Sequence, residues 1–261
     1  MVILYLIITF IFSWALWIPD ALLNSTSITH PLLIWLSQFS NYGAWGPLVS
    51  ALITTIIIKR KKGLIKLFKQ TFNLNFNKKW LLPTLFLFPL MIGLPLLYLY
   101  ITNQPIPKLD EPYSIFILPI VFLIIFVSSG PLQEEHGWRG ILQNSLQTKI
   151  NPLFASIITG LIWGLWHLPL FFIPEQGFYY NRPIWGLILS TTLISILFTW
   201  IYNNTNKNLF LMMIFHTTYN FSHYIFPSIQ SDASGLIYFL LLLITVCGVI
   251  IKSGINLGLK K

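Results

Sequence analysis

The sequence predicts an all-α, polytopic membrane protein with about eight transmembrane helices and both termini in the cytoplasm. Hydrophobic residues make up 55% of the 261 residues and charged residues only 9%, whereas about 25% of a typical soluble domain is charged. Apolar stretches long enough to cross a bilayer, which takes ~20 residues, recur along the whole chain. A β-barrel would show weakly apolar, alternating segments of about ten residues instead. We therefore expect a single integral-membrane domain over residues 1–261.

Each predicted span is recognised by its own features. The first lacks a basic start and a small-residue cleavage site, so we interpret it as a retained helix and not a signal peptide. The second is long because its start can lie in the membrane interface, and the third follows a basic loop. The fourth, fifth and seventh contain polar residues, and the eighth contains the single cysteine, Cys247. The predicted spans are 2–18, 32–58, 80–101, 114–147, 152–173, 184–202, 208–226 and 235–252.

The distribution of basic residues sets the predicted orientation. Residues 59–79 contain 8 of the 16 lysines and arginines, and such loops stay in the cytoplasm. With eight spans, both termini then lie in the cytoplasm. The net charge of +9 is explained by this topology and by contact with membrane lipids, so we expect no nucleic-acid partner. Composition rich in Asn, Ile and Lys is typical of an AT-rich microbial genome, which favours a multi-pass protein of a prokaryotic cell membrane.

The basic loop has two interpretations. Its apolar residues Leu64, Ile65, Leu67 and Phe68 alternate with lysines. This pattern is typical of a short amphipathic helix lying on the anionic inner leaflet. A disordered basic loop is the alternative.

Two adjacent glutamates in the fourth span are the first place to look for chemistry. Glu134 and Glu135 are two of the seven acidic residues in the chain. A carboxylate at membrane depth costs roughly 2.5–3.5 kcal/mol on insertion scales. Structure alone hardly explains two of them side by side. The other five acids lie in stretches that resemble loops: Asp20, Asp110, Glu111, Glu175 and Asp232.

Helical spacing separates the two glutamates. Glu135 and Arg139 are four residues apart and can form an ion pair on one helix face. Glu134 points about 100° away from Glu135, towards a different neighbour. A buried ion pair that locks helices together therefore explains Glu135 and Arg139 well and Glu134 poorly.

Two further spans carry polar residues that could meet these acids. In the fifth, Gly160 and Gly164 form a face of small residues that allows close helix approach, and His167 follows. In the seventh, His216 and Asn220 are one helical turn apart. Interhelical hydrogen bonding explains any one of these residues, but it explains the full set on three spans less well.

The three motifs together resemble those of the CPBP intramembrane protease family, which includes the type II CAAX prenyl endopeptidases and bacteriocin-processing enzymes and is also called the Abi family. Here they read Glu134-Glu135-His136-Gly137-Trp138-Arg139, Trp163-Gly164-Leu165-Trp166-His167 and His216-Thr217-Thr218-Tyr219-Asn220. Each motif alone is weak, but the ordered set is specific. The resemblance covers most of residues 40–225, with its core at 115–225.

The resemblance implies an integral-membrane endopeptidase that cuts membrane-bound proteins or peptides. Glu134 would be the general base that activates a water molecule, assisted by His167. His216 and Asn220 would stabilise the oxyanion, while Glu135 and Arg139 would support the site. The chemistry fits, because hydrolysis needs a base near neutral pH and donors fixed in a dry site stabilise developing negative charge.

The involvement of a metal is left open by the residues. Glu134, His167 and His216 would satisfy a catalytic zinc site with three ligands and one open position. A metal-free glutamate mechanism is equally compatible, and it is slightly favoured because the chain has no His-Glu-x-x-His helix. No oligomeric state is indicated.

Two other classes of function compete with the protease. A non-catalytic membrane immunity or scaffold protein of the same family would use the polar cluster as helix glue or to bind a peptide. A proton- or ion-coupled transporter would use intramembrane carboxylates and histidines as a relay, but transporters usually contain paired repeats, and no internal repeat is evident.

Overall fold

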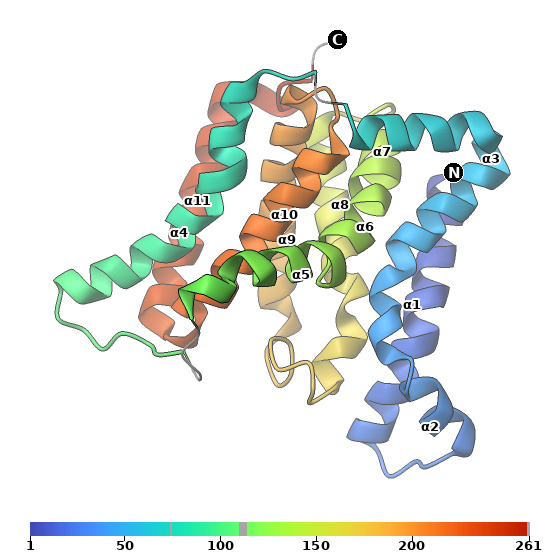
Figure 1. The fold of residues 1–261 in the computed structure, drawn as a ribbon, viewed down its shortest axis with the longest axis horizontal. Helices are drawn as coiled ribbons and strands as arrows, with labels where there is room; N and C mark the ends of the chain where they lie inside the picture. Colours follow the sequence, from blue (N-terminus) through green and yellow to red (C-terminus); the bar gives the residue numbers. More distant parts are fainter. Residues whose placement is uncertain (74, 110–113, 260–261) are drawn as a thin grey trace. The chain divides into compact units, whose positions relative to one another are not determined.

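The computed structural model describes residues 1–73, 75–109 and 114–259, and all regular structure in these ranges is helical (Figure 1). The all-α prediction is therefore confirmed. Within these ranges, seven helical segments are long and apolar enough to cross a membrane: Val2–Ser25, Ser40–Thr71, Lys78–Ile101, Ile115–Leu146, Pro152–Phe172, Ile184–Asn204 and Asp232–Asn256. The chain is a multi-pass membrane protein.

The remaining predicted span, 208–226, corresponds to α10 (Leu209–Ile225), a helix of 17 residues. At 1.5 Å per residue it is about 25 Å long, slightly less than the ~30 Å hydrocarbon core. It falls outside the set of seven, although its bounds agree with the prediction. Asn208 caps its first turn by accepting a hydrogen bond from the Leu211 amide at 2.7 Å.

The chain divides into two compact units, each built from two separate stretches. The first unit comprises Met1–Lys69 and Gln133–Ile196, and the second comprises Gln70–Leu132 and Leu197–Lys261. The boundaries between the units fall inside helices. As a result, the residues predicted to act together are shared between the units: Glu134 and His167 belong to the first, His216 and Asn220 to the second.

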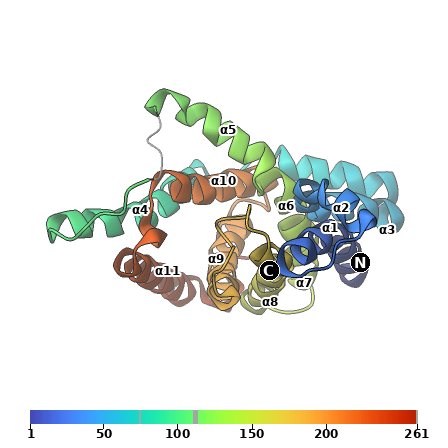
Figure 2. The ribbon, with the colours of Figure 1, turned by 90° about the horizontal axis from the view of Figure 1, so that it is seen from below.

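Among the described residues, ten helical segments lie wholly or mainly in the first unit. They are α1 (Val2–Ser25), α2 (Pro31–Ser37), η1 (Ser40–Trp45), α3 (Gly46–Thr71), α6 (Pro131–Gly137), the π-helix η4 (Trp138–Gln143), α7 (Asn144–Leu146), α8 (Pro152–Trp166), η5 (Leu168–Phe172) and the first part of α9 (Ile184–Asn204), with α3, α6 and α9 crossing a boundary. Helix α1 packs against α2 and η1 (Figure 2). The buried Trp17 indole fixes this packing by donating to the Ser40 carbonyl at 2.9 Å.

The basic loop after the second predicted span is largely helical. Helix α3 continues to Thr71 after a kink at Arg60, whose φ is 53°. Leu67 is buried, while Lys66 and Lys69 are exposed. This is the amphipathic arrangement that was one of the two interpretations of the sequence, and the disordered alternative does not hold for the described residues.

The predicted small-residue face is confirmed as a site of close helix contact. A Cβ atom on Gly160 would lie 2.5 Å from the Thr192 Cα, and one on Gly164 would lie 2.8 Å from the Ile188 Cα, both on α9. Thr191 also donates to the Gly160 carbonyl at 3.0 Å. Glycine is required at these positions because α8 and α9 touch through their backbones.

The second unit is organised around α10. Its segments are η2 (Lys78–Trp80), α4 (Leu81–Ile101), η3 (Ile115–Ile117), α5 (Leu118–Ser128), the last part of α9, α10, η6 (Ser228–Gln230), α11 (Asp232–Ser253) and η7 (Gly254–Asn256). Helix α4 packs against both α10 and α11 (Figure 1), and α10 also packs against α5. Thr218 on α10 donates to the Thr84 carbonyl on α4 at 3.0 Å.

The fourth predicted span, 114–147, agrees in its bounds with the segment Ile115–Leu146, but that segment is not one continuous helix. Helix α5 ends at Ser128, and Gly130 adopts a φ of 107° that side chains rarely allow. Pro131 then opens α6, as expected of a residue with a fixed φ and no amide hydrogen. The glutamate pair therefore lies in the first turns of a new helix, which passes into the π-helix η4.

The loop acids are also partly corrected. Asp20 lies inside α1, which extends to Ser25, and Asp232 is the first residue of α11. Glu175 lies in a turn, as expected. Asp110 and Glu111 lie outside the described residues.

Candidate active site

Glu134 is held by two tryptophans. Its Oε2 accepts a hydrogen bond from the Trp138 Nε1 at 2.9 Å and another from the Trp163 Nε1 at 2.6 Å. Trp138 lies four residues further along the same helical segment, and Trp163 lies on α8. All three side chains are buried, with Glu134 only 5% exposed. The carboxylate is thus fixed in a largely dry environment by two donors that carry no charge.

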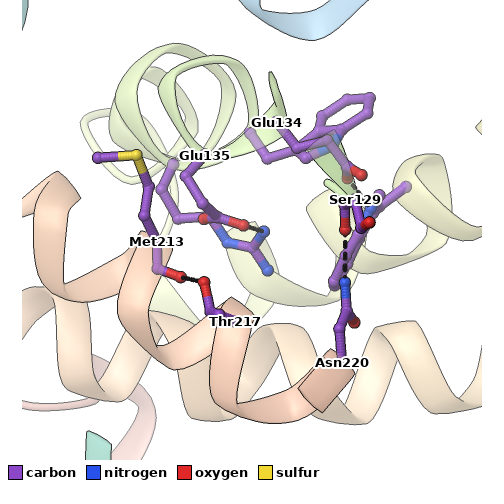
Figure 3. Close-up of polar contacts among 9 residues, drawn as sticks. Ser129, Glu134, Glu135, Met213, Thr217 and Asn220 are labelled. Atoms are coloured by element: carbon purple, nitrogen blue, oxygen red, sulfur yellow. Dashed lines mark hydrogen bonds and ion pairs between the residues drawn. The ribbon is translucent and has the colours of Figure 1, made fainter. Parts of the chain in front are cut away.

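Glu135 forms the ion pair that its spacing predicts. Its Oε1 accepts from the Arg139 Nη1 at 2.9 Å, and neither side chain is exposed (Figure 3). The Arg139 guanidinium also lies over the Trp163 ring, 4.5 Å from its centroid. Such a cation–π contact is stronger in a desolvated place than at a surface. The two glutamates therefore accept hydrogen bonds from different donors. The Trp163 side chain contacts both Arg139 and the Glu134 carboxylate.

His167 lies at the C-terminal end of α8 and is 6% exposed. Its Nδ1 is 2.8 Å from the Trp163 carbonyl oxygen. A carbonyl oxygen only accepts, so Nδ1 carries the hydrogen, and Nε2 of the neutral ring is then the acceptor. Trp163 therefore contacts both residues. Its indole donates to Glu134, and its backbone carbonyl accepts from His167.

The helices that carry these residues are tied together by a polar contact. Thr159 on α8 donates to the Gln143 Oε1 in the π-helix at 2.9 Å, and both side chains are buried. A π-helix is rare and occurs frequently at functional sites, because its wider turn displaces the residues that follow. Here the π-helix begins at Trp138, three residues after Glu135.

In the second unit, His216 and Asn220 lie one turn apart on α10. His216 is 3% exposed and meets the Phe198 ring edge-on, with centroids 5.7 Å apart. The half-buried Asn220 donates from Nδ2 to the Ser129 carbonyl at 2.7 Å (Figure 3). This bond occupies one of two amide hydrogens on Nδ2. Asn220 thereby holds the end of α5, where the chain breaks before the glutamate helix.

The residues suit a metal only in part. Within either unit, the described residues contain no group of three His, Cys, Asp or Glu side chains that could hold a metal ion. The first unit offers Glu134 and a histidine whose Nδ1–H bond to a carbonyl is common among metal-binding histidines. A three-ligand zinc would also need His216, which belongs to the second unit. Metal binding stays a prediction.

The sequence interpretation missed both tryptophans. Trp138 is four residues after Glu134, the same spacing that identified Arg139 as the partner of Glu135. Only charged partners were considered, although an indole N–H is a donor as well. Trp163 lies one helical turn before His167, and its contact with Glu134 depends on how α6 and α8 pack. Spacing along one helix does not contain that information.

Fold and geometry define a class: a multi-pass helical membrane protein with a buried carboxylate and an imidazole fixed by the same residue. The matching family model is described as type II CAAX prenyl endopeptidase Rce1-like and covers residues 116–222. The chain is 31% identical over 231 residues to CAAX prenyl protease 2 of Methanococcus maripaludis, covering 83% of this chain and 82% of that protein. The chain therefore belongs to the Rce1-like type II CAAX prenyl endopeptidase family, a family of membrane proteases.

More distant relatives carry a different name. The chain is 26% identical over 181 residues to lysostaphin resistance protein A of Staphylococcus epidermidis, covering 67% of this chain and 44% of that protein. It is 29% identical over 119 residues to the protein of the same name from Staphylococcus aureus, covering 46% of this chain and 28% of that protein.

Proposed function

We propose that this chain is an intramembrane endopeptidase that hydrolyses peptide bonds of membrane-associated proteins or peptides. The observation that supports this most is the linkage of Glu134 to His167 through Trp163 in a chain of a protease family. A carboxylate and an imidazole fixed by one residue suit proton transfer. Such fixation is unnecessary for residues that merely fill space between helices.

In this proposal Glu134 is the general base. It removes a proton from a water molecule as the water oxygen attacks the carbonyl carbon of the substrate. The two indole donors fix the carboxylate, so little reorganisation is needed during the reaction. The accepting Nε2 of His167 helps to orient the same water. The proton held on Glu134 then passes to the leaving amine as the peptide bond breaks.

His216 and Asn220 are proposed to stabilise the oxyanion. The second hydrogen on the Asn220 Nδ2 and a ring N–H of His216 are the donors, one helical turn apart on α10. Removal of one such donor in other hydrolases typically costs 10²–10³-fold in kcat. This role requires both units to contribute to one catalytic domain, residues 1–261.

Glu135 and Arg139 are proposed to support the site. Their ion pair is fully buried, and Arg139 lies against the tryptophan that holds Glu134. If zinc is bound, Glu134, His167 and His216 would be its ligands, and it would polarise the water and the substrate carbonyl. The steps above are assigned to the chain's own side chains.

For topology, we propose that the basic segment 59–79 and both termini lie in the cytoplasm of a prokaryotic cell. Eight of the 16 lysines and arginines lie in this segment, and the amphipathic end of α3 places exposed lysines beside a buried leucine. Anionic lipids of the inner leaflet are the expected partners of this surface.

Glu134→Ala tests the protease directly. The purified chain is reconstituted in liposomes with two fluorogenic substrates, a farnesylated CAAX-type peptide and an unprenylated single-span reporter. We expect the natural chain to cut at least one of them and Glu134→Ala to cut neither. Glu175→Gln, in an exposed turn, is the matched control and should retain activity. Full activity of Glu134→Ala would overturn the proposal.

A non-catalytic immunity function is the second candidate, and the name of the staphylococcal relatives favours it. It predicts a different outcome for Glu134→Gln, because an amide oxygen still accepts both indole hydrogens while the basic group is lost. If the function rests on binding alone, cells carrying Glu134→Gln keep any protection that the natural chain confers. If it rests on proteolysis, that protection disappears.

A further inference from the structure

The loop that follows η5 carries a tyrosine against the predicted catalytic histidine. The Tyr179 ring lies 5.3 Å from the His167 ring, centroid to centroid, at an interplanar angle of 30°. On another side, the Trp166 ring meets His167 at 4.7 Å and 75°. The imidazole is therefore held by a carbonyl at Nδ1, by an edge-on indole and by a phenol ring inclined at 30°.

Tyr179 itself is held in place. The Phe171 and Phe178 rings lie 5.6 and 5.1 Å from it. The Gln176 carbonyl accepts from the Tyr179 amide at 2.7 Å and from the Tyr180 amide at 3.0 Å, which closes a tight turn around the tyrosine. Asn181 follows with a φ of 55°, a conformation that asparagine tolerates better than most residues.

A histidine at the end of a helix needs such support. His167 is the C-cap residue of α8, and the Nδ1 bond to the Trp163 carbonyl joins its ring to that helix. Rotation about its side-chain torsions would break the Nδ1 bond to the Trp163 carbonyl and change the direction of Nε2. The half-buried Tyr179 ring, inclined at 30° to the imidazole, opposes this rotation.

We propose that Tyr179 is a positioning residue that fixes the His167 ring for catalysis and covers one of its faces. This inference rests on the proposed function in assigning His167 a catalytic role. The contact that supports this inference is between the two rings, and phenylalanine also supplies a ring. Phenylalanine should replace tyrosine, and alanine should not.

A chemical readout tests the positioning without any enzyme activity. Diethyl pyrocarbonate carbethoxylates accessible imidazole nitrogens, and peptide mass spectrometry measures the rate at each histidine. We expect Tyr179→Ala to raise the rate at His167 at least threefold, because one ring face is uncovered. Tyr179→Phe and Tyr180→Ala should leave the rate as in the natural chain. The exposed His30 serves as the internal reference in every sample.

Kinetics test the catalytic consequence with the fluorogenic substrates in liposomes. Aromatic pairs of this kind correspond to about a three- to tenfold effect. Tyr179→Ala should therefore lower kcat about three- to tenfold with KM unchanged, and Tyr179→Phe should restore kcat. A general loss of folding would instead lower the active fraction of both variants and the thermal midpoint.

The outcomes separate this inference from the proposed function. An unchanged His167 modification rate in Tyr179→Ala overturns the inference, even if Glu134→Ala is inactive. An unchanged kcat in Tyr179→Ala overturns it as well. If Glu134→Ala stays active while Tyr179→Ala exposes His167, the protease proposal fails and the ring contact stands. A lowered kcat that phenylalanine does not restore contradicts the ring-packing argument.

Discussion

Removal of both indole donors to Glu134 should impair catalysis far more than removal of either one. Trp138 and Trp163 donate to the same carboxylate oxygen at 2.9 and 2.6 Å. A hydrogen bond to a charged group contributes about 1.5–3 kcal/mol. While one indole remains, the carboxylate stays anchored, so each single phenylalanine variant should lose about tenfold in kcat, near the lower end of that range. The double variant lacks both indole donors and should lose more than the product of the two, over about a hundredfold.

The assay is cleavage of the fluorogenic substrates in liposomes by Trp138→Phe, Trp163→Phe and the double variant. Phenylalanine keeps a ring under Arg139 in place of Trp163, so the cation–π contact is largely preserved. Trp17→Phe is the matched control, because it removes a buried indole N–H that donates to a backbone carbonyl. It should lower the thermal midpoint and leave kcat unchanged. A double variant within twofold of the natural kcat would refute the reasoning.

Three further predictions concern stability and topology. Glu135→Gln replaces the carboxylate that pairs with the buried Arg139 by a neutral amide, so unfolding should become easier by about 3–5 kcal/mol, measured as a lower thermal midpoint in detergent; an unchanged midpoint would contradict the pairing. Gly160→Ala should destabilise by about 1–3 kcal/mol through overpacking against the α9 backbone, whereas Gly186→Ala, with open space around it, should not. Lys62→Cys, in a variant without the native cysteine, should react with an impermeant maleimide in inverted vesicles and not in intact cells; the reverse labelling would invert the proposed topology.

Features that depend on spacing within one helix were predictable from the sequence. The Glu135–Arg139 pair follows from a four-residue interval, and the close approach at Gly160 follows from two glycines one turn apart. The apolar spans were located because hydropathy acts over ~20 residues at a time. His216 and Asn220 were predicted to lie one turn apart on one helix because they are four residues apart, and both lie on α10.

Features that depend on backbone breaks or on neighbouring helices were not predictable. The hydropathy of the predicted span 114–147 did not indicate the break at Gly130, because hydropathy does not depend on the φ of a single residue. The bond from Trp163 to Glu134 joins α8 to α6 and requires their packing to be known. The contact of Tyr179 with His167 depends on the turn that presents the ring. How His216 and Asn220 act with Glu134 stays a prediction.

The central claim is that Glu134 acts as a base and not as helix glue, and Glu134→Gln tests it most directly. The amide oxygen keeps the hydrogen bonds from Trp138 and Trp163, so the fold and the thermal midpoint should be retained. Loss of a general base typically costs 10²–10⁴-fold. We expect kcat in liposomes to fall by at least about a hundredfold at an unchanged midpoint. Cleavage at the natural rate by a folded Glu134→Gln protein would contradict the account.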